Sequence, residues 1–150
     1  MAHANPSDQE LKQLLTDATV IAMVGASSDP DKASNGIMRK LQRAGYRVIP
    51  VNPKETEILG ERSYASLIDI PERIDIVDVF RRAEDTPSIA DEAVTIGARA
   101  LWLQTGIVSE DAAARAEAGG LTVVMDACIG ATHSLLRVEK KAQKPASRQR

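Results

Sequence analysis

The stretch TVIAMVGASS, residues 19–28, joins a short apolar run to a loop of small residues. Four similar apolar runs follow at intervals too long for hairpins: YRVIPVN (46–52), IDIVDVF (74–80), ARALWLQ (98–104) and LTVVMD (121–126). Their apolar character is nearly continuous instead of alternating, so both faces of each strand should be covered, as in a parallel sheet. The five runs predict five buried strands.

The segments between these runs have helical spacing of apolar residues. Helices are predicted from Ser34 to Ala44, with Gly45 as a left-handed cap, and over the ranges 83–97 and 109–118. A short amphipathic helix should begin after Ser7, where Glu10 completes a capping box. Strand and helix alternate, which predicts a single doubly wound α/β domain with a five-stranded, mostly parallel sheet and a ligand site at the carboxyl ends of its strands.

The segment 53–73 has no sustained period. Gly60 predicts a tight turn within it, and a short helix is expected around Tyr64 to Asp69, ending before Pro71.

Composition limits the functional classes. The 150 residues are 43% hydrophobic with a net charge of −2, which suits one globular domain and disfavours a general binder of nucleic acid or anionic membranes. The longest apolar run, residues 20–24, is too short to span a membrane, and no signal-peptide pattern precedes it. One cysteine excludes an internal disulfide and fits a reducing compartment, so we expect a cytoplasmic protein.

The charge is unevenly distributed along the chain. Residues 138–150 contain five basic residues and one acid, whereas residues 1–137 contain 14 basic and 20 acidic residues. We therefore divide the chain into an N-terminal helical segment (1–18), the α/β domain (19–137) and a basic tail (138–150) that is expected to be disordered.

The loop that follows the first predicted strand is the first candidate site. In Gly25-Ala26-Ser27-Ser28 the small side chains let main-chain N–H groups approach a phosphate, and the next helix adds a favourable dipole. A turn without any ligand is the alternative. Neither a Walker Lys-Ser/Thr pair nor a G-x-G-x-x-G fingerprint is present, which disfavours nucleoside-triphosphate hydrolysis and NAD binding.

Three further strand ends supply polar candidates. Asn52-Pro53-Lys54 lacks the carboxylate that would accept from a free ribose diol and suits a ribose with an extra phosphate, although a simple turn is equally compatible. Phe80-Arg81 brings a cation that can fork around phosphate oxygens, with a solvated surface arginine as the alternative. Gln104-Thr105-Gly106 combines an amide with a close backbone approach.

Catalytic groups are few. Cys128 follows the fifth predicted strand, and a buried, inert thiol is the favoured interpretation because no His or Lys stands beside it in sequence. His133 is interpreted as an incidental residue. Asp75, Asp78 and Glu84 do not form a convincing acid/base pair.

Together, the segments 24–27, 45–54, 58–71, 75–82, 100–107 and 120–129 resemble the small, stand-alone CoA-binding proteins of bacteria and archaea. The resemblance covers about residues 15–130 and extends to the CoA-binding, Rossmann-like domain of the succinyl-CoA synthetase alpha subunit. It implies CoA or acyl-CoA in the cleft at the strand ends.

Carried over by position, the resemblance gives four groups of residues a role. The loop Gly25-Ala26-Ser27-Ser28 would hold phosphates, Asn52-Pro53-Lys54 would flank the nucleotide, Phe80-Arg81 would add charge, and Gln104-Thr105-Gly106 would line the floor. Residues 129–133 depart from the family pattern and are given no role. The phosphohistidine of the synthetase lies outside the matching region, so ligase activity is not implied.

Three functional hypotheses follow. The first is a CoA-binding module that acts as carrier, sensor or subunit, with no catalytic residue and an unknown protein partner. The second is an enzyme in which Cys128 or His133 acts on an acyl-CoA thioester, and the third is an NAD-binding, redox-sensing domain.

Overall fold

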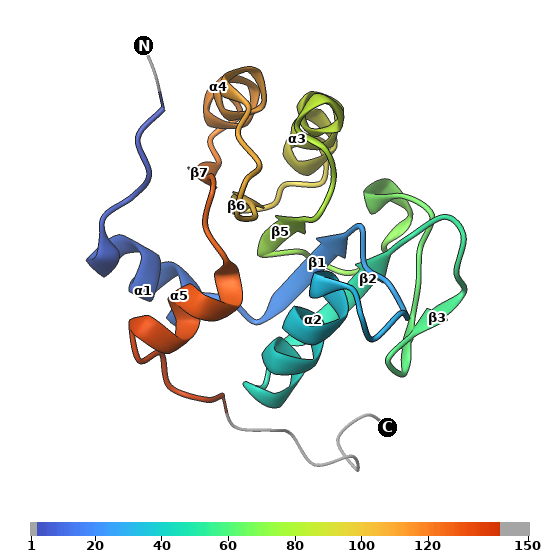
Figure 1. Ribbon diagram of the computed structural model, residues 1–150. Helices are drawn as coiled ribbons and strands as arrows, with labels where there is room; N and C mark the ends of the chain where they lie inside the picture. The colour runs from blue at the N-terminus through green and yellow to red at the C-terminus, as the bar shows by residue number, and fades with distance from the viewer. Residues whose placement is uncertain (1–2, 142–150) are drawn as a thin grey trace.

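The computed structural model describes residues 3–141. Five parallel strands form one sheet in the order β2 (Arg47–Val51), β1 (Val20–Val24), β5 (Ile76–Val79), β6 (Ala100–Leu103) and β7 (Thr122–Val124) (Figure 1). Every neighbouring pair is parallel, which confirms the predicted doubly wound, Rossmann-like α/β fold and its five strands. The strand order reverses next to β1, and such a reversal opens a crevice at the carboxyl ends.

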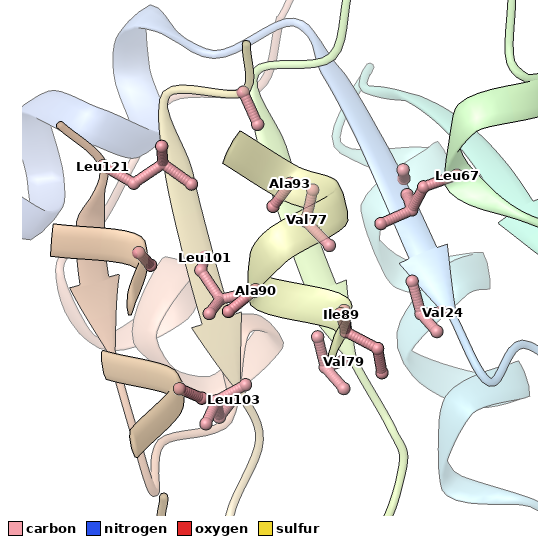
Figure 2. Close-up of a cluster of buried hydrophobic side chains, with 14 of the residues drawn as sticks. Val24, Leu67, Val77, Val79, Ile89, Ala90, Ala93, Leu101, Leu103 and Leu121 are labelled. Atoms are coloured by element: carbon pink, nitrogen blue, oxygen red, sulfur yellow. The ribbon is translucent and has the colours of Figure 1, made fainter. Parts of the chain in front are cut away.

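Helices cover both faces of this sheet (Figure 1). Helices α3 (Thr86–Thr95) and α4 (Glu110–Ala118) pack on one face, whereas α1 (Asp8–Asp17), α2 (Ala33–Arg43) and α5 (Ile129–Leu135) pack on the other. Alternate residues of β1 serve the two faces: Val24 joins the α3–α4 core of Figure 2 and Met23 joins the opposite core. Trp102 of β6 is fully buried, as its apolar context predicts.

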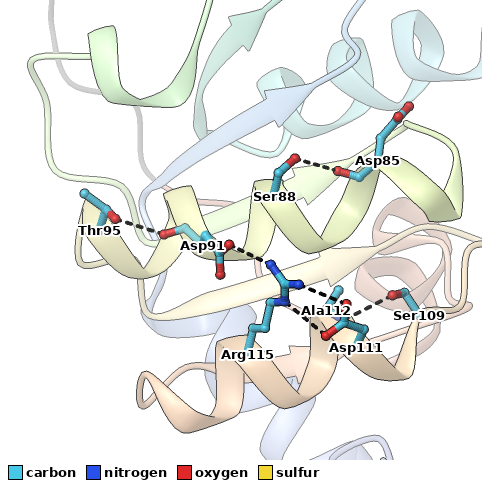
Figure 3. A network of polar contacts seen from close by, with 8 residues as sticks. All are labelled: Asp85, Ser88, Asp91, Thr95, Ser109, Asp111, Ala112 and Arg115. Carbon is cyan, nitrogen blue, oxygen red and sulfur yellow. Dashed lines mark hydrogen bonds and ion pairs between the residues drawn. The ribbon is translucent and has the colours of Figure 1, made fainter.

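Helix ends follow the local signals. The Ser7 side chain accepts from Glu10 N–H, and the Glu10 carboxylate accepts from Ser7 N–H at 2.9 Å, so the capping box before α1 is present. Gly45 ends α2 at a φ of 97°. On the outer surface, Arg115 of α4 binds Asp91 of α3 and Asp111 of its own helix (Figure 3).

Three short elements between β2 and β5, and the last helix, differ from the sequence expectation. Strands β3 (Glu57–Ile58) and β4 (Glu61–Arg62) form a hairpin with Gly60 in its turn, and only η1 (Leu67–Asp69) is helical within 64–69. Tyr64 instead forms a parallel bridge with Val51. Helix α5 was not expected, because its seven residues are too few to show a period and include Gly130.

The chain after α5 remains packed up to the last described residue. Val138 is buried, and the N–H of Lys141 donates to the carbonyl of Ala44 at 2.8 Å. Residues 138–141 of the tail predicted to be disordered, 138–150, are therefore packed against the domain, and its remainder lies outside the described residues. Within residues 3–141, no helix has the length and apolarity that crossing a membrane requires.

Candidate functional site

A cavity of about 710 Å³ opens at the carboxyl ends of β1, β2 and β5, where the strand order reverses. Its walls come from the loops after these three strands, from the start of α2, from the segment at η1 and from one side of α3. This is the position at which doubly wound sheets bind ligands, and the volume is in the range of small-molecule sites.

Gly25 sets how closely the loops approach each other at this edge. Its N–H donates to Val51 at 3.1 Å, and Phe80 N–H donates to Val24 at 2.8 Å, which joins the ends of three strands. Gly25 has a φ of 89°, and a Cβ added there would lie 2.4 Å from the Phe80 carbonyl oxygen. No other residue fits this position without moving the backbone.

Four main-chain N–H groups of the cavity wall have no partner within residues 3–141. They belong to Ala26 and Ser27 of the β1 loop and to Ala33 and Ser34 at the start of α2, whose N-cap residue makes no side-chain cap bond. Free N–H groups at a helix start attract anions, because the helix dipole places partial positive charge there.

Two asparagines hold this loop in place. The Asn52 side-chain amide donates to the Ala26 carbonyl at 2.8 Å, and its oxygen accepts from Lys54 N–H at 2.8 Å. From α2, the Asn35 amide donates to the Ser27 carbonyl at 2.9 Å. Both amides bond to carbonyls, and this orientation leaves the loop N–H groups free for a ligand.

Charged side chains of both signs line the cavity. Lys32, Lys54 and Arg81 are the cations, and Arg81 forms an ion pair with Asp85 at 3.2 Å. Glu92, further along α3, is a second carboxylate of the wall.

A second cavity of about 480 Å³ adjoins the first and shares Ala33, Phe80 and Arg81 with it. Its remaining wall is more apolar and consists of Ile37, Arg82, Gln104, Thr105, Ile107 and Cys128. A long ligand that bound at the shared residues could reach both spaces.

The predicted residues divide between the two cavities. Eight of them line the first cavity: Gly25, Ala26, Ser27, Asn52, Pro53, Lys54, Phe80 and Arg81. Four line the second cavity, namely Gln104 and Thr105 together with the shared Phe80 and Arg81. Ser28 and Gly106 are not among the lining residues. The Ser28 N–H donates to Glu55 at 3.1 Å and the Gly106 N–H donates to Asp126 at 2.7 Å, so both groups are engaged within the protein.

Sequence reasoning missed the part of the first cavity that helices supply. Lys32 and Ser34 come from the start of α2, Ser66 precedes η1, and Ser88 and Glu92 come from α3. The positions 85, 88, 89 and 92 have the spacing of one helix face, which is the signal that could have revealed them.

Gln104 is directed into the protein more than into a cavity. It is 4% exposed, its amide donates to the Asp78 carboxyl group, and its oxygen accepts from Ile129 N–H at 3.3 Å. Asp78 is fully buried, and the burial raises its pKa to about 8 although the Gln104 hydrogen bond opposes the shift. This buried pair connects β5 and β6 to the start of α5, and of the two residues only Gln104 belongs to the sequence-based site.

The two candidate nucleophile and base residues have separate environments. Cys128 is half-buried in the wall of the second cavity, which corrects the expectation of a buried thiol. His133 lines neither cavity and packs edge-on against Tyr46, with ring centroids 5.7 Å apart. Burial, with Lys40 and Lys141 nearby, lowers the pKa of His133.

Comparison with known proteins agrees with this geometry. The profile of the CoA-binding domain matches residues 19–134, which include all five strands and both cavities. The chain belongs to the CoA-binding domain family.

Family members of similar size and much larger proteins both match the chain. YneT of Bacillus subtilis is 42% identical over 133 residues, with 89% of this chain and 98% of YneT covered. A solved structure from Pyrococcus horikoshii is 35% identical with a TM-score of 0.86, over 91% of this chain and 99% of that one. The ADP-forming acetate–CoA ligase I of Archaeoglobus fulgidus is 29% identical over 74% of this chain, but the match spans only 18% of the ligase.

Proposed function

We propose that this protein binds CoA or acyl-CoA across the two cavities, as a carrier, sensor or subunit. The observation that supports this most is the group of four free N–H groups of Ala26, Ser27, Ala33 and Ser34 in one wall of the first cavity. These N–H groups would hold the diphosphate, as at other helix starts that bind phosphate. Arg81 and the lysines of the wall would add positive charge.

The end of β2 favours CoA over NAD. Asn52 is committed to the β1 loop, and the carboxylate of Glu55 accepts from Ser28 N–H instead of facing the cavity. An NAD site has a carboxylate at this position, which accepts hydrogen bonds from the free ribose diol. Here the cavity wall has Lys54 instead, and its positive charge suits the additional ribose phosphate of CoA.

The second cavity fits the remainder of a CoA molecule. Ile37, Ile107 and Phe80 give it an apolar wall, and the shared Phe80 and Arg81 make it continuous with the nucleotide cavity. A pantetheine arm that left the diphosphate at Arg81 would enter this space.

Ligand-dependent stabilisation tests the proposal directly. Thermal unfolding is measured in parallel with CoA, dephospho-CoA, acetyl-CoA, NAD and ATP. A ligand at about 100 times its dissociation constant adds about 2.7 kcal/mol to the free energy of unfolding and raises the midpoint by several degrees. We expect CoA to stabilise more than dephospho-CoA. Stabilisation by NAD or ATP without any by CoA would refute the proposal.

Removal of the Arg81 guanidinium should weaken CoA binding. We expect Arg81→Ala to lower the affinity about tenfold or more, because a charge-assisted hydrogen bond contributes about 1.5–3 kcal/mol. Isothermal titration of the folded variant measures this. Arg115→Ala is the matched control, since the Arg115 side chain is 43% exposed against 45% for Arg81 and its ion pairs lie on the outer surface of α3 and α4 (Figure 3). Equal CoA affinity in both variants would remove Arg81 from the site.

A further inference from the structure

One end of the first cavity is anionic. The Glu92 side chain on α3 is half-buried, and its Oε1 accepts from the Ser66 hydroxyl at 3.3 Å. Both residues line the cavity, and no ion pair formed within residues 3–141 neutralises the Glu92 carboxylate. A carboxylate without an ion-pair partner repels phosphate and can only accept hydrogen bonds. This end of the cavity therefore suits a ligand group that donates a hydrogen bond.

The Arg81 guanidinium lies near the start of α3, away from Glu92. Ser88, Ile89 and Glu92 form the face of α3 that lines the cavity, and Arg81 is paired with Asp85, the residue immediately before that helix. Glu92 follows Asp85 by seven positions in the chain, which is about 10 Å along a helix axis. A ligand that extends along α3 would therefore meet Arg81 near Asp85 and the acceptor at Glu92.

Apolar side chains form another part of the cavity wall. Val24, Val51, Leu67 and Ile89 line the same cavity, and each is almost completely buried apart from the surface that the cavity leaves accessible. Figure 2 shows Val24, Leu67 and Ile89 on one face of the sheet, on three separate segments. A flat heterocycle could rest against these residues with its polar edge toward Ser66 and Glu92.

We propose that Glu92 and Ser66 form a base-recognition element that selects adenine through its exocyclic 6-amino group. The amino group would donate to the Glu92 carboxylate, which the Ser66 hydroxyl holds in place by donating to its Oε1. The adenine edge offers this donor beside an acceptor, whereas a purine without the amino group offers acceptors alone. This inference rests on the proposed nucleotide binding and adds its specificity.

Two matched nucleotides test the proposal. Adenosine 3′,5′-bisphosphate and purine riboside 3′,5′-bisphosphate differ only in the 6-amino group, and their affinities are measured by isothermal titration together with that of CoA. In the wild type we expect the adenosine compound to bind about tenfold or more tightly, as for one hydrogen bond to a charged group. In Glu92→Leu this preference should disappear, and in Glu92→Gln it should be partly retained because the amide oxygen still accepts.

The neighbouring acid on α3 provides the control. Asp91 does not line the cavity and pairs with Arg115 at 2.8 Å (Figure 3), so Asp91→Leu should keep the full preference. The midpoint of thermal unfolding verifies that each variant is folded. An unchanged preference in Glu92→Leu, or no preference in the wild type while CoA binds, would overturn the role of Glu92 alone. Failure of CoA and both nucleotides to bind the wild type would overturn the proposed function and this inference with it.

Discussion

Gly25→Ala is expected to destabilise the protein by about 3 kcal/mol or more and to abolish ligand binding. Two costs combine at this position. The φ of 89° is unfavourable for any residue with a side chain, and the new Cβ would lie 2.4 Å from the Phe80 carbonyl oxygen. The backbone at the ends of β1 and β5 would have to separate, which would displace the free N–H groups of Ala26 and Ser27. Urea unfolding measures the loss of stability.

Gly60→Ala separates these two costs. Gly60 has a similar φ of 82°, but nothing lies within 4 Å of an added Cβ in the β3–β4 turn. Only the conformational cost applies there, about 1–2 kcal/mol. If both variants lost the same free energy of unfolding, the close approach of Phe80 to Gly25 would not matter for stability.

Asp78→Asn should change the pH dependence of stability more than any other single substitution of a carboxylate. The folded state holds the Asp78 carboxyl with a pKa of about 8, because the group is buried, whereas the unfolded chain ionises it near pH 4. Between these values the folded state binds the extra proton. The stability contribution of this group is therefore complete below pH 4 and falls as the pH rises to 8, by up to about 1.4 kcal/mol per pH unit.

An asparagine at this position stays neutral and can still accept from Gln104. We expect Asp78→Asn to have a free energy of unfolding close to the wild type at pH 4 and to exceed it by roughly 2 kcal/mol or more at pH 8. Guanidinium unfolding of both proteins across this range measures the difference. A difference that did not vary with pH would show that Asp78 does not titrate in this window.

Asp75 gives the control with the opposite sign. Burial opposes its ionisation, but the hydrogen bonds from Thr19 and Val20 to its carboxylate dominate and lower its pKa. The contribution of Asp75 is present above the unfolded pKa and is lost as the pH falls through the folded one. Asp75→Asn should therefore reduce stability at neutral pH, and the loss should shrink toward acid pH.

The Asp78 pair also affects the second cavity. Gln104 bridges Asp78 and the N–H of Ile129, and Cys128, one residue earlier, forms part of the cavity wall. An ionised Asp78 would be an uncompensated buried charge, with its Oδ2 unpartnered within the described residues. The neutral form keeps this junction between β6 and α5 together.

The fold was largely readable from local patterns. Continuous apolar runs indicated strands that are buried on both faces and therefore parallel. The Ser7–Glu10 capping box and the glycine after α2 marked helix ends. These signals depend on neighbouring residues alone. Helix α5 and the β3–β4 hairpin are not predicted from the sequence, because a seven-residue helix and two-residue strands are too short to show a hydrophobic period.

Sequence alone also placed the candidate residues at strand ends, but not their arrangement. The order β2-β1-β5 brings the residues after these strands to one cavity, and it places Gln104 and Thr105, after β6, in the neighbouring one. Strand order results from pairing between segments far apart in the chain, which no local pattern encodes. The inward direction of Gln104, the burial of Asp78 and the position of Glu92 opposite Ser66 likewise depend on packing between elements. The sequence by itself determined which segments form strands and which polar residues end them, and the tertiary structure decided which of those residues meet.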